Sequence, residues 1–103
     1  CIVSTSEGNE YAARAVILAT GSRHRPLGIA REEEFIGHGI SYCAVCDGAF
    51  YAGKEIAVIG GGNSALQEAV MLSDICKKVT VIQNLAYLTG EKRLADKLHA
   101  KDM

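Results

Sequence analysis

The sequence predicts an α/β fold in which a small parallel sheet is preceded by a β-hairpin and a linker. Two short apolar runs, residues 55–59 and 78–83, have the composition of buried strands. Between them a glycine cluster ends the first run, and apolar residues then recur at helical spacing over residues 63–76. Because strand, helix and strand follow one another in the chain, we expect the two strands to pair in parallel through a right-handed crossover.

The outer segments complete this expected architecture. Residues 1–5 and 11–20 flank a turn-forming cluster and predict a hairpin whose second strand, which includes the apolar stretch 15–19, is buried. The stretch 23–39 contains glycine, proline and mixed charges, a composition typical of a linker. A charged helix with one apolar face is expected over residues 91–101.

Composition excludes several classes of partner. The 11 basic and 12 acidic residues give a formal net charge of -1, which provides no electrostatic attraction for nucleic acid or an anionic membrane. No apolar run approaches the roughly 20 residues that cross a bilayer, and no basic segment followed by an apolar one opens the chain. We therefore expect a cytoplasmic protein with neither partner. The chain begins at Cys1 inside an expected strand, so we also expect it to be a piece of a longer protein.

The glycine cluster matches the pattern GxGxxA between a strand and a helix, which predicts a dinucleotide site on a partial Rossmann-like sheet. In this pattern the first glycine permits the tight turn, the second lets a pyrophosphate approach the backbone, and the small last residue allows close packing of helix on strand. A glycine-rich turn in an unrelated α/β protein remains the alternative. The candidate cofactor-binding residues are Gly60, Gly61, Gly62, Asn63, Ser64 and Ala65.

The residue at the end of the second strand usually selects the nicotinamide cofactor. An acid there pairs with the ribose hydroxyls, whereas arginines pair with a 2′-phosphate. Here the position is Gln83, followed by Asn84 and Leu85, so neither signature is present. Gln83 can hydrogen-bond a ribose hydroxyl but cannot neutralise a phosphate dianion. Lys92 and Arg93 are expected to be solvated surface charges, with folding back toward a phosphate as the alternative.

Cys43 and Cys46 form a CxxC pair with small apolar residues between them, followed at once by Asp47. This spacing allows an exchangeable disulfide, and Asp47 can pass a proton to the departing thiolate. A zinc site is the alternative, but zinc requires four ligands and the remaining candidates are scattered, so no metal is expected. Cys76, on the apolar side of the expected helix, is interpreted as a small core residue. The scattered candidates are Cys1, His24, His38, Cys76 and His99.

These motifs together resemble the low-molecular-weight thioredoxin reductases, a family of two-nucleotide flavin disulfide reductases. The segment 42–48 reads YCAVCDG and ends twelve residues before the glycine motif, and an Ala-Thr-Gly segment, 19–21, lies upstream. The resemblance covers nearly the whole chain. It implies that residues 1–22 are the edge of a flavin domain, 23–39 an inter-domain linker, and 40–103 the first part of a nicotinamide-binding domain carrying the CxxC pair.

The resemblance also implies roles for individual residues. Cys43 would be the interchange thiol that attacks the substrate disulfide, Cys46 the thiol facing the flavin, and Asp47 the acid. Thr20 and Gly21 would lie close to FAD. Electrons would pass from nicotinamide to FAD, then to the Cys43–Cys46 disulfide and on to thioredoxin or a thioredoxin-like protein, and the full-length enzyme would be a homodimer.

Two departures from the family pattern leave alternatives open. Members that use NADPH carry an arginine-bearing segment where this chain has Gln83, so the donor is NADPH, NADH or, as in some relatives, ferredoxin. An NADH-dependent peroxiredoxin (alkyl hydroperoxide) reductase component is the nearest alternative enzyme, and a nucleotide-binding module without redox activity is the alternative from another class. The flavin motifs that the family carries before and after this stretch are missing, so the chain by itself is expected to be inactive.

Overall fold

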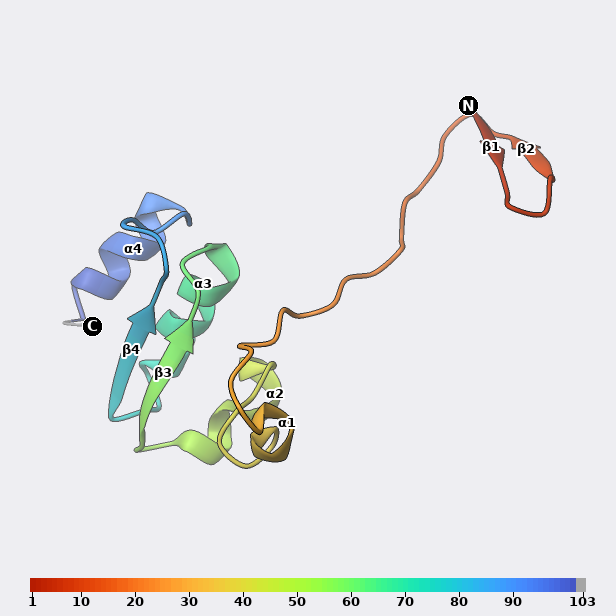
Figure 1. The fold of residues 1–103 in the computed structure, drawn as a ribbon. Helices are drawn as coiled ribbons and strands as arrows, with labels where there is room; N and C mark the ends of the chain where they lie inside the picture. Colours follow the sequence, from red (N-terminus) through yellow and green to blue (C-terminus); the bar gives the residue numbers. More distant parts are fainter. Residues whose placement is uncertain (102–103) are drawn as a thin grey trace.

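The computed structural model describes residues 1–101 and shows a hairpin joined by an extended segment to an α/β unit (Figure 1). The hairpin pairs β1 (Ile2–Ser4) with β2 (Glu10–Ala12) in antiparallel register. Residues 13–29 contain no helix or strand. The helices and strands of the α/β unit therefore all lie within residues 30–101.

The sheet of the α/β unit is parallel, as the sequence predicts. Strands β3 (Glu55–Ile59) and β4 (Lys78–Ile82) lie in register from end to end and are joined by α3 (Asn63–Leu72). A last helix, α4 (Lys92–His99), lies beside α3 on the same face of the sheet (Figure 1). This arrangement is an α/β fold consistent with part of a Rossmann-like domain.

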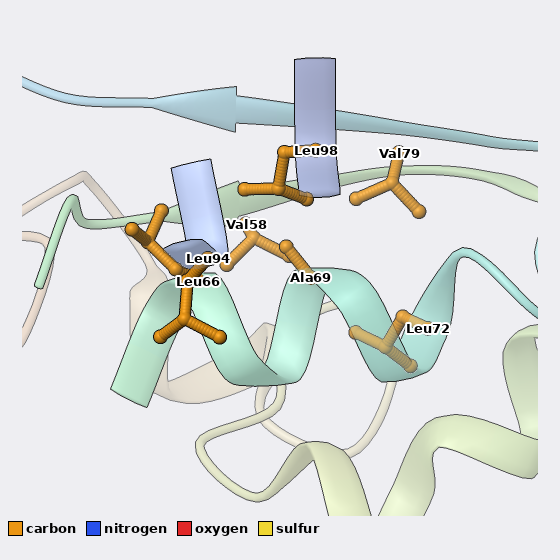
Figure 2. Packing of buried hydrophobic residues seen from close by; sticks show 7 residues of the cluster. All are labelled: Val58, Leu66, Ala69, Leu72, Val79, Leu94 and Leu98. Carbon is orange, nitrogen blue, oxygen red and sulfur yellow. The ribbon is translucent and has the colours of Figure 1, made fainter. Parts of the chain in front are cut away.

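The core lies between the helices and the sheet. Leu66 and Ala69 are fully buried on α3, and Val79 of β4 is 2% exposed. Figure 2 shows that Leu94 and Leu98 from α4 point into the same cluster. Because Leu66 and Ala69 are three residues apart, both lie on the same side of the helix, and this side packs against the sheet. This packing fixes the position of α3, and with it both ends of the helix.

Three short helical segments precede the sheet, and the sequence did not predict any of them. They are α1 (Glu32–Phe35), α2 (Ala44–Asp47) and the 3-10 helix η1 (Gly48–Tyr51). Contact with α3 explains the position of α2 and η1, since a Cβ added at Gly48 would lie 2.9 Å from Leu72 Cδ2. The Cys76 thiol donates to the Tyr51 carbonyl at 3.4 Å and packs against the core, in agreement with its interpretation as a packing residue.

The prediction of a buried second hairpin strand over residues 11–20 was wrong. Strand β2 ends at Ala12, and the apolar side chains that follow are exposed, Ile17 to 91% and Leu18 to 86%. The physical reason is that β structure in such a run depends on a neighbouring strand and a covering layer, and no element of residues 1–101 supplies them.

Smaller differences concern the helix ends. Helix α3 ends at Leu72 and is followed by turns rather than continuing to residue 76. Its N-cap is Gly62, and no side chain caps the helix. No helix within residues 1–101 has both the length and the apolar character to cross a membrane.

We predict that Leu66→Ala lowers the free energy of unfolding by about 2–5 kcal/mol, because the fully buried side chain leaves a cavity between α3 and the sheet. Urea denaturation followed by circular dichroism measures the change. Leu85, which is 48% exposed, provides the matched control, and Leu85→Ala should change the free energy by less than about 0.5 kcal/mol. Equal losses in the two variants would contradict the packing described above.

Candidate active site

The structure joins Cys43 and Cys46 in a disulfide at the start of α2, with their Cα atoms 5.2 Å apart. Cys43 is the N-cap residue of this helix, and its backbone is extended, with φ −138° and ψ 91°. The Cys46 amide donates to Cys43 Sγ at 3.2 Å, and the Asp47 amide donates to the Cys43 carbonyl at 3.0 Å. Cys46 is an exposed residue and Cys43 a half-buried one, so the pair lies at the surface.

Asp47 is tied to the cysteine pair through a residue that the sequence analysis did not single out. The Ser41 hydroxyl lies 2.6 Å from Asp47 Oδ2 and accepts a hydrogen bond from the Cys43 amide at 3.1 Å. The Cys43 carbonyl is a second possible acceptor for the hydroxyl proton, at 3.3 Å. The shorter distance and the charge of the carboxylate favour Asp47 as the acceptor. A hydroxyl two residues before a helix N-cap was the sequence signal available for this contact.

The glycine turn has the geometry that its pattern predicts. Gly60 has φ +131°, a conformation that side chains disfavour, and its amide donates to the Ile82 carbonyl at 2.8 Å. A Cβ at Gly60 would lie 3.1 Å from the Ala65 Cβ, so the helix and strand approach closely there. Gly62 then begins α3, whose first turn leaves backbone N–H groups without partners inside the helix. The space beside Gly62 is open, with only Thr89 Oγ1 within 4 Å of an added Cβ. This end of α3 is thus suited to receive an anion such as a pyrophosphate.

A loop after β4 holds the glycine turn from the other side, through hydrogen bonds that the sequence did not predict. The Gly61 carbonyl accepts hydrogen bonds from the amides of Thr89 and Gly90, both at 2.8 Å. Asn63 Oδ1 accepts from the Glu91 amide at 2.7 Å, so Asn63 holds this loop instead of capping its own helix. These contacts join residues 28 or 29 positions apart, and no local pattern in the sequence indicates them.

The structure places Gln83 against the glycine turn. A Cβ at Gly61 would lie 2.4 Å from Gln83 Nε2, so the glutamine side chain occupies the space that a larger residue would need. Its Oε1 accepts from the Asn84 amide at 3.0 Å. Arg93 is exposed and forms an ion pair with Glu91 at 2.6 Å. The strand end beside the turn is therefore lined by a neutral amide.

Thr20 and Gly21 lie apart from the features above. Both are exposed in the connecting segment, and Gly21 has φ +77° with no other atom near its missing Cβ. In Figure 1 this segment runs from the hairpin toward α1 and does not approach the glycine turn. The structure thus brings Cys43, Cys46 and Asp47 together and assembles the glycine turn separately, at the start of α3.

A buried carboxylate anchors the linker to the residue before the cysteine pair. Glu32 is 8% exposed and accepts hydrogen bonds from the amides of Leu27 and Gly28, both at 2.8 Å, and from the Tyr42 hydroxyl. The Tyr42 hydroxyl and these amides hold the pKa of Glu32 below its usual range. In turn, the Glu32 carboxylate raises the pKa of Tyr42. The ring of His24 stacks on Tyr42 at 3.7 Å, which extends the anchor further into the linker.

Comparison with known proteins agrees with this geometry. Residues 1–101 match the family model of the pyridine nucleotide-disulphide oxidoreductases. The chain belongs to this family. Membership accounts for the presence of a dinucleotide-type turn and a disulfide on one α/β unit.

Individual relatives of this oxidoreductase segment are about three times longer than it is. Over 96 residues it is 49% identical to the thioredoxin reductase of Rickettsia prowazekii, covering 93% of the chain and 31% of the relative. It is 46% identical over 97 residues to the glucosaminate ammonia-lyase of Pseudomonas fluorescens, covering 94% and 30%. The crystal structure of T. acidophilum thioredoxin reductase superposes with a TM-score of 0.79 at 34% identity, covering 99% of this chain and 33% of that one. The chain thus spans about a third of the length of these relatives.

We predict that Glu32→Gln loosens the linker, because glutamine keeps only one neutral acceptor oxygen, whereas both carboxylate oxygens of Glu32 accept a backbone amide. The direct measurement is amide hydrogen exchange at Leu27 and Gly28, whose N–H groups donate to Glu32. Their protection should fall severalfold. The neighbouring variant Glu33→Gln is the matched control, since Glu33 is exposed, and unchanged protection in Glu32→Gln would contradict the anchor.

The same anchor should depend on pH. Because the pKa of Glu32 is lowered in the folded chain, its contribution is present above the usual glutamate pKa and is lost as pH falls through the lowered value. Because the pKa of Tyr42 is raised, its contribution is present below the usual tyrosine pKa and is lost as pH rises through the raised value. Exchange protection at Leu27 and Gly28 should therefore be highest between these limits. Glu32 and Tyr42 line a surface hollow, and the other charged or titratable groups that line it are His24, Arg31, Glu33 and Glu34.

Proposed function

We propose that this chain is part of a flavin-dependent enzyme that reduces the disulfide of a dithiol carrier, thioredoxin or a thioredoxin-like protein. The observation that carries the proposal is a surface disulfide, Cys43–Cys46, on the same α/β unit as a dinucleotide-type glycine turn. A dinucleotide donor and an exchangeable disulfide are the two components of such a reaction. The thioredoxin reductase names of several relatives support the same reading.

In the proposed reaction the cysteine pair carries two electrons. Bound FAD would supply the electron pair that opens the Cys43–Cys46 disulfide. The Cys43 thiolate then attacks the carrier disulfide, forming a mixed disulfide and releasing one carrier thiolate. The Cys46 thiolate attacks Cys43 Sγ, which releases the second carrier thiolate and restores the original disulfide. Asp47 supplies a proton to one departing thiolate and solvent supplies the second, so that the carrier leaves as a dithiol.

The exposure of the two cysteine residues fits these assignments in a longer protein. Cys46, assigned to the flavin side, is the more exposed residue of the pair in this segment. Thr20 and Gly21 are proposed to contact FAD, and their exposure leaves both residues accessible to it. The division into a flavin edge, a linker and a nicotinamide domain, together with a cytoplasmic homodimer, belongs to the same proposal.

For the nicotinamide, the residues of the glycine turn are proposed to bind the pyrophosphate and Gln83 a ribose hydroxyl. The open backbone at Gly62 and the first turn of α3 fit an anion. Gln83 carries no charge, and the nearby Arg93 is paired with Glu91. This observation favours NADH, and with it the second candidate function, an NADH-dependent reductase of a peroxiredoxin.

We predict that in the full-length protein Cys43→Ser and Cys46→Ser each abolish reduction of the protein disulfide while leaving FAD bound. Each variant removes one of the two sulfurs that the exchange requires. Cys76→Ser, which preserves a donor toward the Tyr51 carbonyl, is the control and should change the rate little. Turnover at the wild-type rate after loss of either sulfur would overturn the relay.

We further predict that NADPH has no advantage over NADH. A 2′-phosphate carries close to two negative charges near neutral pH, and neutral Gln83 offers no cation to it. A hydrogen bond from Gln83 to a ribose hydroxyl is worth about 0.5–1.5 kcal/mol, so NADH should bind with modest affinity. Titration of the full-length flavoenzyme with each nicotinamide, followed by flavin bleaching, measures the preference, with reduced ferredoxin run in parallel.

A hundredfold preference for NADPH is the result that would contradict this reasoning. That ratio corresponds to about 2.7 kcal/mol of specific contact with the phosphate. It would imply that Lys92 or Arg93 turns back toward the cofactor. The variant Arg93→Gln then shows whether Arg93 is the cation involved, because the preference for NADPH would disappear in this variant only if Arg93 contacts the phosphate.

A further inference from the structure

The hydroxyl of Ser41 is part of a small ring of hydrogen bonds around the first cysteine. It accepts from the Cys43 amide at 3.1 Å and lies 2.6 Å from Asp47 Oδ2. The Asp47 amide closes the ring by donating to the Cys43 carbonyl at 3.0 Å. Within residues 1–101, Ser41 is the one side chain that donates to the Asp47 carboxylate.

This ring fixes the orientation of the carboxylate. An aspartate side chain has two rotatable bonds, and on a four-residue helix at the surface nothing intrinsic selects one rotamer. The charged hydrogen bond from Ser41 selects the rotamer in which Oδ2 lies on the Cys43 side of the helix start. The Cys43 amide occupies one lone pair of the Ser41 oxygen, and this oxygen is nearer to Asp47 Oδ2, at 2.6 Å, than to the Cys43 carbonyl, at 3.3 Å.

The ring does not include the disulfide. Reduction breaks the bond between Cys43 and Cys46 and thus removes a covalent constraint on α2. The hydrogen bonds among Ser41, Cys43 and Asp47 involve no sulfur atom and survive that step. The carboxylate can therefore stay beside the first cysteine in both the disulfide and the dithiol form.

We propose that Ser41 is a positioning residue for Asp47, which it holds toward the first cysteine so that the carboxyl group can transfer its proton during disulfide exchange. This inference rests on the proposed function, in which Asp47 is the acid. Ser41 itself exchanges no proton with the carrier and forms no bond to it. Its effect on the reaction passes entirely through Asp47.

The test is a double-mutant cycle in the full-length flavoenzyme. The rate of carrier disulfide reduction by the prereduced protein is measured across pH for wild type, Ser41→Ala, Asp47→Asn and the double variant. Loss of one hydrogen bond to a charged group should slow Ser41→Ala about tenfold. Ser41→Thr retains a hydroxyl and should recover most of the rate. Ser73→Ala, which removes a hydroxyl bonded to the Val70 carbonyl at 2.6 Å, is the matched control and should leave the rate unchanged.

Two readouts separate positioning from a general effect on folding. In the Asp47→Asn background, Ser41→Ala should have no further effect, because its influence passes through the carboxylate. In the wild-type background, Ser41→Thr should restore most of the rate that Ser41→Ala loses, because it returns a hydroxyl donor to Asp47. Ser73→Ala should leave the rate unchanged.

Several outcomes would overturn the proposal, and each has a different meaning. If Ser41→Ala slows both backgrounds by the same factor, Ser41 acts on the fold of the segment and not on Asp47. If Asp47→Asn keeps the wild-type rate and pH profile while Cys43→Ser is inactive, the assigned acid is wrong but the disulfide relay stands. If Cys43→Ser is also fully active, the proposed function itself fails.

Discussion

The buried face of α3 is the constraint on which both halves of the candidate site depend. Leu66 and Ala69 are fully buried against the sheet, so the helix cannot shift without opening the core. Its first turn begins at Gly62 in the glycine turn, and its last residue, Leu72, packs on Gly48, which follows directly after Asp47. One packed helix therefore sets the separation between the place suited to a dinucleotide and the redox-active pair. Hydrogen bonds from the loop around Gly90 then hold the turn end in place.

The sequence predicted those features that follow from local patterns. The parallel pairing of β3 and β4 and the turn at Gly60 arise from short-range periodicity and from a backbone conformation that glycine tolerates, and the structure confirms both. The short helices α1, α2 and η1 escaped notice, because segments of four residues show too little periodicity to be recognised. The contact of Asn63 with Glu91 could not be predicted from the sequence either, since it depends on a loop that is distant in the chain and close in the fold.

The hairpin region shows why an apolar run alone does not establish a buried strand. Ile17 and Leu18 are 91% and 86% exposed, although their sequence context predicted burial. Exposed contiguous apolar surface is unfavourable in water and usually marks a place that another part of a protein covers. The relatives are about three times as long as this chain, which supports the proposal that a flavin domain supplies the missing layer. The apolar composition of this run indicates side chains that tend to be buried, but only the tertiary context determines whether they are.

The segment leading into the redox pair is held on two sides by different interactions. Successive side chains of an extended backbone point in opposite directions, and Cys43 has extended dihedrals. Tyr42 accordingly reaches Glu32 and the linker, whereas Ser41 bonds with Asp47 and the Cys43 amide. None of these hydrogen bonds uses a sulfur atom, so opening the disulfide does not require any of them to break. In the proposed relay the first cysteine would then keep its place for attack on a carrier, whereas Cys46 would lose its covalent constraint.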